Sequence, residues 1–371
     1  MRFEALSTLT AAALAAAAPA TAPVEARQEK TDVPNVTVIG TGGTIAGVGS
    51  EFDTTGYEAG VIPIKTVMDR IPDLDTRANV SAIQYSNKAS EAFVSSDMVD
   101  IAKLTNDLLC APDSDQAGVV ITEGTDTVEE TAFLLDSLIN CNKPVIVTAS
   151  MRPGTAVSSD GQGNLLEAIT LAGSEKAKGR GAMVVLNDRI QSAFYTSKMN
   201  ANNMDAFDEK NAEIGGFLNY EPYFYYTQAQ PTFKKTFNLD ETLKKNATSL
   251  PKVDMIYGSQ DFDSGLITAA ASLGSEGIVI QGVGEGSIPS FAVDAINEVV
   301  DQGIPVVVSA KPIYGASVPM EDASSASYIK SGYVKAAQAK VYLELALANG
   351  YNMDQIRELF EGDLRSAIFH Q

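Results

Sequence analysis

The sequence predicts an α/β protein made of two domains, each with a mostly parallel sheet. Short apolar runs rich in β-branched residues alternate with amphipathic helical patterns, the alternation breaks once, and it then restarts. The chain has 371 residues, which is long for one ordinary domain and suits two. No internal repeat of fixed period is visible in the sequence.

Four buried strands are predicted in the first part of the chain, at Asn35–Ile39, Gly118–Thr122, Val145–Ala149 and Ala182–Leu186. Helices are expected between them, because Asp97–Leu109 and Val128–Ile139 each place their apolar residues on one helical face. Strands that are joined through helices run parallel, so the first sheet should be mostly parallel.

The alternation breaks after the aromatic segment Tyr220–Tyr226. We interpret residues 232–251, which are polar and Lys-rich, as an interdomain linker between an N-terminal domain at 24–231 and a smaller C-terminal domain at 252–371. In the second domain we expect strands at Asp254–Tyr257, Gly277–Gln281 and Pro305–Ser309, and helices near 264–273, 291–302, 334–349 and 353–362.

Residues 1–23 have the features of an export signal peptide. Arg2 stands at the front, an apolar run extends from Ala12 to Ala18, and the small-residue pattern Ala20-Thr21-Ala22 follows. The alternative is a plain Ala-rich terminus. On the first interpretation the mature protein is periplasmic or secreted. No other run is long and apolar enough to span a bilayer, so no membrane association is expected.

The formal net charge of −20 restricts the partners of the protein. An acidic surface repels phosphate backbones and anionic lipids, so nucleic acid is not an expected partner.

Cys110 and Cys141 are the two cysteines of the chain. In a reducing compartment they would be small buried apolar residues, whereas in an exported protein an even count suggests a disulfide. We favour the disulfide, because it agrees with the export signal. Closing a loop of about 30 residues would stabilise the fold by ~3–4 kcal/mol in the chain-entropy model.

The chain has a single histidine, His370, next to its last residue. This position disfavours Ser-His-Asp and Cys-His catalytic sites. It also excludes zinc sites built on paired histidines, and two cysteines cannot supply the missing ligands. We therefore expect no metal and no cofactor. If the protein is a hydrolase, its base must be Lys, Asp, Glu or Tyr.

Two predicted strands end in a Gly-Thr turn. The first runs into Gly40–Gly47, where Ile45 replaces the third glycine of a dinucleotide-binding loop and no Gly-Lys-Ser/Thr of a phosphate-binding loop follows. This segment is either an ordinary strand-to-loop turn or an N–H-lined turn that presents the Thr44 hydroxyl.

The second strand runs into Glu123-Gly124-Thr125-Asp126-Thr127. Asp126 and Thr127 alone would be explained as the N-cap of the next helix. The recurrence of Gly-Thr after two strands favours function, because ligands bind outside the carboxyl ends of the strands in open α/β sheets. Thr44 and Thr125 would then face one crevice.

A threonine hydroxyl is a weak nucleophile and needs a base. Where histidine is absent, a partly desolvated lysine held by an aspartate can serve. Lys198, which follows the run Ala193–Tyr195, is one candidate, although the residues alone do not single it out from the other lysines.

At these residues the sequence resembles the bacterial type II L-asparaginases of the asparaginase/glutaminase family. Gly42–Gly47 is similar to the first family signature and Gly124–Thr127 to the second. The segments Met151-Arg152-Pro153, Asp160-Gly161, Asn187-Asp188 and Lys198 follow in the family's order, so the similarity extends from about Pro34 to the helix at 353–362. The cysteine pair falls where the exported enzymes carry a disulfide.

The resemblance implies that Thr44 attacks the side-chain amide of L-asparagine and forms an acyl-enzyme, while Tyr57 helps to take its proton. Ammonia would leave first, and water would then release aspartate. A supporting triad would comprise Thr125, Asp126 and Lys198. Backbone N–H groups of Gly43 and Thr125 would stabilise the oxyanion.

The resemblance also implies that Ser90 and Glu91 bind the α-carboxylate and α-ammonium groups of the substrate, with Asp126 sharing the ammonium. Without the resemblance, Ser90-Glu91 would be an ordinary approach to a helix. Ser287 and Glu321 resemble residues that the family lends across a subunit contact, which implies a homotetramer with sites at subunit interfaces.

Glu123 stands where the type II enzymes usually carry histidine. A carboxylate beside Asp126 should raise the pKa of one of the two and that of Lys198, so we expect a pH–rate profile that differs from that of a Glu123→His variant.

Two serines also depart from the family pattern. Ser150, counted here with the substrate-binding residues, replaces a usual alanine. Ser287, with Glu285 two residues before it, replaces an Asn-containing pattern. Together with the Ser90-Glu91 pair, Ser287 is more similar to the glutaminase-asparaginases, which makes L-glutamine a candidate second substrate.

Two other functions deserve comparison. An exported small amino-acid binding protein would also be acidic and two-domain, but it would need no Gly-Thr hydroxyls and would release no ammonia. A cytosolic amidotransferase subunit acting on misacylated tRNA is disfavoured by the export signal, the cysteine pair and the charge of −20.

Overall fold

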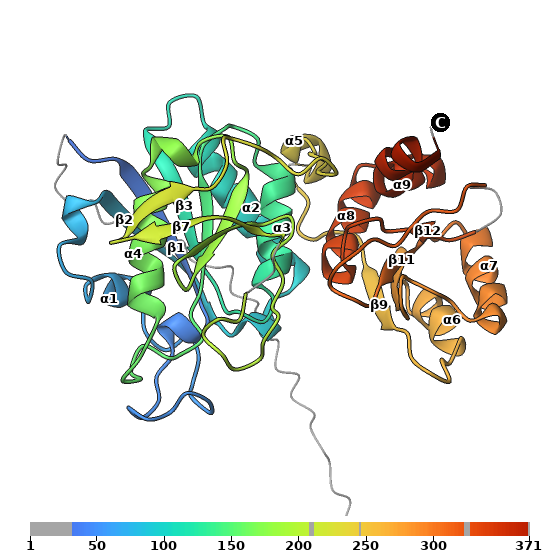
Figure 1. Ribbon diagram of the computed structural model, residues 1–371, viewed down its shortest axis with the longest axis horizontal. Coiled ribbons are helices and arrows are strands. Elements are labelled where there is room, and N and C mark those ends of the chain that lie inside the picture. The colour runs from blue at the N-terminus through green and yellow to red at the C-terminus, as the bar shows by residue number, and fades with distance from the viewer. Residues whose placement is uncertain (1–31, 208–210, 245, 323–326, 370–371) are drawn as a thin grey trace, which may run out of the picture.

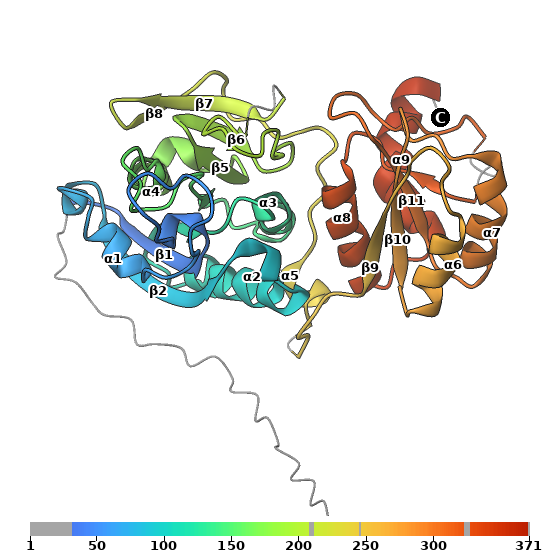
Figure 2. The same cartoon turned by 90° about the horizontal axis from the view of Figure 1, so that it is seen from below.

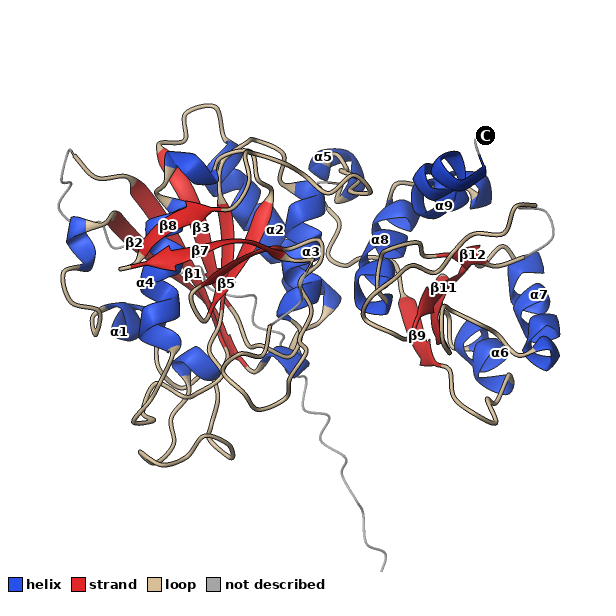
Figure 3. Ribbon diagram, in the orientation of Figure 1, coloured by secondary structure: helices blue, strands red, loops and turns tan. Residues whose placement is uncertain are grey.

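The computed structural model describes residues 32–207, 211–244, 246–322 and 327–369, and the expected signal segment at 1–23 lies outside them. Two sheets, each covered by helices, lie side by side (Figure 1). Strands occupy the middle of each half and helices its outside (Figure 3). The chain therefore has the expected α/β architecture.

The larger sheet has eight strands in the order β2-β1-β3-β4-β5-β6-β7-β8. All pairs from β2 to β5 are parallel, and the last three strands are added antiparallel. The strands are β1 (Asn35–Gly42), β2 (Asn79–Lys88), β3 (Gln116–Thr122), β4 (Val145–Thr148), β5 (Ala182–Leu186), β6 (Arg189–Ser192), β7 (Glu213–Leu218) and β8 (Glu221–Phe224).

Successive residues of the central strands enter opposite cores, as the two-residue period of a strand requires. Val119 and Ile121 pack with helices α2 (Ser95–Cys110) and α3 (Val128–Leu138), whereas Val120 packs with α1 (Ile64–Met68) and α4 (Gly161–Ala172). Because both faces are covered, these strands are mostly buried and most of their residues are apolar.

The smaller sheet is wholly parallel, in the order β12-β11-β10-β9. Helices α6 and α7 pack on one face, and α8 and α9 pack on the other. The elements are β9 (Val253–Tyr257), α6 (Gly265–Ser272), β10 (Gly277–Gly282), α7 (Val293–Asp301), β11 (Val306–Ala310), β12 (Ile329–Lys330), α8 (Ala336–Ala348) and α9 (Met353–Phe369).

One apolar core continues from the larger sheet into the smaller one. Helices α3 and α8 face each other between the sheets (Figure 2), and the fully buried Tyr342 of α8 sits edge-on against Phe133 of α3, with ring centroids 4.5 Å apart. Lys340 of α8 pairs with Glu130 of α3 at 3.1 Å. The two sheets are therefore joined by a buried interface.

Residues 232–251 pack more tightly than their polar composition suggests. They contain a short helix, α5 (Leu239–Thr242), and Phe237 and Leu243 are buried in the shared core. Lys234 forms an almost buried ion pair with Asp136 at 2.6 Å. The segment expected to be a linker is therefore part of the packed structure.

The expected strands and helices are present, with ends that differ by a few residues. The sequence did not indicate β2, which is half-buried and polar, nor the antiparallel strands β6 to β8. Helix α9 continues to Phe369, beyond the expected end at 362. Within the residues described, no helix has both the length and the apolar character needed to cross a membrane.

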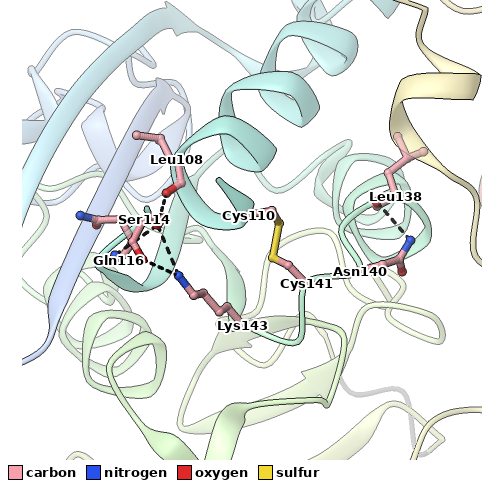
Figure 4. The surroundings of a disulfide bond; sticks show 8 residues. All are labelled: Leu108, Cys110, Ser114, Gln116, Leu138, Asn140, Cys141 and Lys143. Carbon is pink, nitrogen blue, oxygen red and sulfur yellow. Dashed lines mark hydrogen bonds between the residues drawn. A yellow bond between two sulfur atoms is a disulfide. The ribbon is translucent and has the colours of Figure 1, made fainter. Parts of the chain in front are cut away.

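The predicted disulfide between Cys110 and Cys141 is present, with an S–S distance of 2.10 Å (Figure 4). It joins the last residue of α2 to the segment that follows α3. Next to it, Lys143 Nζ donates to Ser114 O at 3.1 Å, and Ser114 Oγ donates to Leu108 O at 2.6 Å. The bond and these contacts hold together the ends of the two helices.

Replacing both cysteines by serine should lower the free energy of unfolding by about 3 kcal/mol, because the unfolded chain regains the freedom of the closed loop. Urea denaturation of the wild type and of the Cys110→Ser/Cys141→Ser variant measures this difference. Wild-type protein unfolded with a reductant should match the variant. An unchanged urea midpoint without reductant would show that the bond contributes nothing.

Candidate active site

The order of the strands in the larger sheet alone indicates where the site lies. The chain passes from β1 to β2 on one side and reaches β3 on the other, so the order reverses between β1 and β3. Open α/β sheets bind ligands at such a reversal, outside the carboxyl ends of the strands. The two Gly-Thr turns follow β1 and β3 at this point.

Glycine allows these two turns to touch. Gly43 has a φ of 72°, and a Cβ atom on it would lie 2.5 Å from the Gly124 backbone nitrogen. A Cβ atom on Gly124 would lie 2.6 Å from Ser90 Oγ. The close approach of three chain segments requires both glycines, which accounts for the repeated Gly-Thr pattern.

A pocket of about 350 Å³ opens beside these turns, a volume suited to a small molecule. It is lined by eight of the residues predicted from the sequence: Gly43, Thr44, Tyr57, Ser90, Glu91, Thr125, Asp126 and Lys198. They come from four separate segments of the chain. The structure therefore brings the two hydroxyls and the lysine into one cavity.

Thr44 and Tyr57 form the first polar pair of the pocket. Thr44 opens a short 3-10 helix, is only 7% exposed, and has its Oγ1 2.6 Å from the Tyr57 hydroxyl. Tyr57 lies near the end of a loop whose ends pair through Val48 and Glu58. The Thr155 hydroxyl accepts from Gly49 N and donates to Gly49 O, both at 2.9 Å, which anchors this loop.

Lys198 forms the second polar group with Thr125 and Asp126. Its ammonium donates to Thr125 Oγ1 at 2.8 Å and to Asp126 Oδ1 at 2.6 Å. The Lys198 backbone N–H donates to Glu129 Oε2 at 3.0 Å, which fixes the segment to α3. Burial raises the pKa of Glu129, while its bonds to Ser197 and Lys198 oppose that rise.

Ser90 lines the pocket and is hydrogen-bonded to the second Gly-Thr turn. Ser90 is 3% exposed, and its Oγ accepts a hydrogen bond from Asp126 N at 3.1 Å. Glu91 is exposed and lines the pocket. These positions differ from an ordinary helix approach, since Ser90 faces the Thr125 turn and not only its own helix.

Gly43 differs from the expectation in one respect. Its backbone N–H donates to Lys88 O at 2.8 Å, so it is not free to bind an oxyanion. Thr44 is the first residue of the 3-10 helix, and the first N–H groups of a helix have no partner within it. The N–H groups of Thr44 and Thr125 therefore replace Gly43 and Thr125 as candidate oxyanion donors.

Three other predicted residues lie outside this pocket. Ser150 is fully buried, and its hydroxyl donates to Arg152 O at 2.8 Å; the neighbouring Met151 lines the pocket instead. Ser287 N donates to Val283 O, and Arg365 donates to the backbone of Glu321. Ser287 and Glu321 belong to the smaller sheet domain, so the described part of one chain does not bring them to Thr44.

The sequence did not identify several residues that line the pocket, among them Thr54, Thr55 and Asn202. Thr54 and Thr55 precede Tyr57 in its loop, and Asn202 follows Lys198 by four residues. Proximity to a predicted catalytic residue is the one signal that could have identified them, since their loops have no periodic pattern.

Glu123 does not face Asp126 as expected. Its fully buried carboxyl accepts hydrogen bonds from Thr131 Oγ1 at 3.1 Å and Thr127 Oγ1 at 3.3 Å, in the first turn of α3. The pKa of Glu123 is raised to about 8, mainly by burial; the two hydroxyl bonds oppose the rise, and the nearby carboxylates of Glu130 and Asp97 add to it. The raised pKa thus has burial, not Asp126, as its main cause.

The geometry defines a class of protein. A shielded threonine hydroxyl touches a phenol, a second threonine hydroxyl touches an ammonium held by a carboxylate, and all face a cavity of substrate size. This arrangement can activate a hydroxyl nucleophile without histidine, as in a covalent hydrolase of the acyl-transfer type.

Comparison with known proteins gives the family. Residues 35–230 match the family model described as Asparaginase, N-terminal, and residues 252–360 match the Glutaminase/Asparaginase C-terminal domain. L-asparaginase 2-3 of Saccharomyces cerevisiae is 39% identical over 91% of this chain and 92% of the relative. The glutaminase-asparaginase of Acinetobacter glutaminasificans is 32% identical over 88% and 98%.

The chain belongs to the asparaginase family, whose members are hydrolases. The crystal structure of a probable cytoplasmic L-asparaginase from Campylobacter jejuni has the same fold, with a TM-score of 0.82 and 35% identity. The match covers 88% of this chain and 99% of the Campylobacter jejuni chain.

Two expectations change with these comparisons. The expected periplasmic or secreted location is wrong, because the structure that shares this fold belongs to a protein described as probably cytoplasmic. The restriction to bacterial enzymes also does not hold, because a yeast protein is among the relatives.

Glu123→Gln should remove a pH-dependent loss of stability. Between pH about 4.5 and about 8 the unfolded chain has released the Glu123 proton that the folded protein retains. The wild-type free energy of unfolding should therefore fall across this window relative to the variant, by roughly 4 kcal/mol in total.

Urea denaturation at pH 5, 6.5 and 8.5 measures the difference between the two proteins. Glu175→Gln is the matched control, because its side chain is 81% exposed. A difference that is the same at all three pH values would contradict the assigned burial effect.

Proposed function

We propose that this protein hydrolyses the side-chain amide of L-asparagine to L-aspartate and ammonia through a Thr44 acyl-enzyme. The observation that carries the proposal is the meeting of the Thr44–Tyr57 pair and the Thr125–Asp126–Lys198 group in one pocket. Two relatives named L-asparaginase and glutaminase-asparaginase support the substrate class.

In the proposed reaction, the Thr44 oxygen attacks the amide carbon while its proton passes to the Tyr57 oxygen and the Tyr57 proton passes on to the amide nitrogen. The oxyanion that forms is stabilised by the N–H groups of Thr44 and Thr125. The amide nitrogen takes a proton and leaves as ammonia. Water then attacks the ester, and the Thr44 hydroxyl is regenerated as aspartate leaves.

Lys198 suits the role of proton shuttle because its ammonium bridges a hydroxyl and a carboxylate. Its side chain is 18% exposed, whereas that of Asp126 is 61% exposed and can reach the α-ammonium group of a substrate. Ser90 would donate to the α-carboxylate, and Glu91 would share the α-ammonium with Asp126. The pocket thus offers acceptors for the ammonium and hydroxyl donors for the carboxylate.

L-glutamine is a proposed second substrate. The support is the Ser90-Glu91 pair at the pocket, the residue Ser287, and the similarity to a glutaminase-asparaginase. We also propose that the protein is of type II, which the Cys110–Cys141 disulfide supports.

We also propose a homotetramer in which Ser287 and Glu321 complete the site of a neighbouring subunit. Among the residues that the structure describes, those lining the pocket of one chain all lie between positions 43 and 202. The smaller domain in turn exposes large apolar side chains such as Tyr257, Phe291 and Leu273, which a subunit contact would cover.

Thr44→Ala should lower kcat by about 10³-fold or more, because the nucleophile is lost. Lys198→Met should lower kcat by about 10²-fold or more, since proton transfer is lost. Ammonia release from L-asparagine and L-glutamine measures both. Thr170→Ala is the control, because that hydroxyl donates to Leu166 O of its own helix, away from the pocket. Binding of L-asparagine by the wild type without any ammonia would indicate a binding protein instead.

Glu321→Ala should lower kcat/KM by about tenfold or more although Glu321 lies outside the pocket of its own chain. Light scattering on the eluting wild-type protein should give four times the mass of one chain. A fully active monomer, or a tetramer unaffected by Glu321→Ala, would contradict the shared site.

A further inference from the structure

Glu123 has a buried carboxyl that the proposed reaction does not use. It directly precedes the Gly124-Thr125 turn, and its backbone N–H donates to Thr148 O at 3.0 Å, which holds the residue in line with β4. Oε1 accepts from Thr127 and Thr131, while Oε2 has no hydrogen-bond partner in the part of the chain that the structure describes. A bare oxygen in a buried site penalises the ionised form, so the neutral carboxyl is favoured.

The Thr127 hydroxyl lies between two acceptors. Its Oγ1 is 3.1 Å from Ser90 O and 3.3 Å from Glu123 Oε1. A hydroxyl carries one proton, so it donates fully to only one of them. A neutral Glu123 has its own proton to donate and leaves the Thr127 proton to Ser90. An ionised Glu123 is an acceptor only, and the stronger charge-assisted bond draws the Thr127 proton away from Ser90.

The bond from Thr127 is one of two that tie Ser90 to the second Gly-Thr turn. The other is donated by Asp126 N to Ser90 Oγ at 3.1 Å. Ser90 O also accepts from Phe93 N within its own short helix, which does not link it to that turn. Loss of the Thr127 bond would therefore loosen Ser90 and Glu91 relative to Thr125 and leave the catalytic groups in place.

We propose that Glu123 is a positioning residue for substrate binding, which in its neutral form leaves Thr127 to hold Ser90 and in its ionised form releases Ser90. This inference rests on the proposed function, because it takes Ser90 to contact the substrate. It assigns to Glu123 an effect on KM and none on the chemical step.

Burial and the charges around Glu123 set the pH of this change. Asp97 of α2 and Glu130 of α3 face it, and they are paired with Lys88 of β2 and Lys340 of α8. Burial, supported by these two carboxylates, raises the pKa of Glu123 to about 8. Ser90 is thus held below pH 8 and released above it.

The test compares wild type and Glu123→Gln from pH 6 to pH 9.5, with kcat and KM for L-asparagine taken from ammonia release. The glutamine side chain introduced at position 123 has the same shape as glutamate and does not ionise. The substrate's own α-ammonium titrates in this range for both enzymes, so the ratio of the two KM values isolates Glu123. The wild-type KM should rise about fivefold relative to the variant, with a midpoint near pH 8, as expected for one lost hydrogen bond. The ratio of kcat values should stay flat.

Thr127→Val provides an independent variant, because it removes the hydroxyl and keeps Glu123. Its KM should be about fivefold higher at low pH and show no step at pH 8, and Thr127→Ser should restore the wild-type profile. Glu167→Gln is the matched control. Glu167 is another buried carboxyl, on α4, whose pKa burial raises to about 9, and the control should keep the wild-type KM step.

A KM ratio that is constant with pH, or a step that appears in kcat, would overturn the role of Glu123. The same holds if Thr127→Val keeps the step. If the wild type releases no ammonia at any pH, the proposed function fails instead, which is a distinguishable result. Circular dichroism of each variant identifies a loss of folding.

Discussion

The structure depends on the contact between two glycines at the point where the strand order reverses. Gly43 after β1 lies so close to the Gly124 backbone after β3 that it could not carry a side chain, and Ser90 excludes a side chain on Gly124. This contact sets the distance between Thr44 and Thr125, because each threonine directly follows its glycine. Because β1 and β3 are parallel, their turns lie at the same edge of the sheet, and the glycines allow these turns to come into contact. Backbone geometry alone therefore places both hydroxyls at one cavity.

The lysine reaches the same cavity by a different route. The backbone N–H of Lys198 donates to the carboxylate of Glu129 on α3. Two residues earlier, Thr196 O accepts a hydrogen bond from Gln338 of α8. The smaller domain therefore touches the segment that presents the ammonium. A substitution on α8 can thus change the position of Lys198 without touching the cavity itself. The domain interface is in this sense a part of the catalytic architecture.

Much of this arrangement follows from local sequence, and the rest depends on distant packing. Strands such as β3 contain a buried apolar run and could be recognised, whereas β2 is half-buried at the sheet edge and has no such run. Thr44 and Thr125 are marked by their glycines. Lys198 bonds to Thr125 across 73 residues, a relation that no periodicity encodes. The sequence could not predict that the Glu123 side chain points away from Asp126 either, because this orientation depends on where α3 begins.

The buried course of residues 232–251 limits how the two halves of the molecule can be separated. Phe237, Leu243 and the ion pair of Lys234 with Asp136 belong to the core that Tyr342 completes. A protease that cuts near Pro251 would leave two fragments with complementary apolar faces, which would stay associated or aggregate. Chimaeras that exchange the smaller half between relatives must therefore take residues 232–251 and the matching face of α8 from the same parent protein.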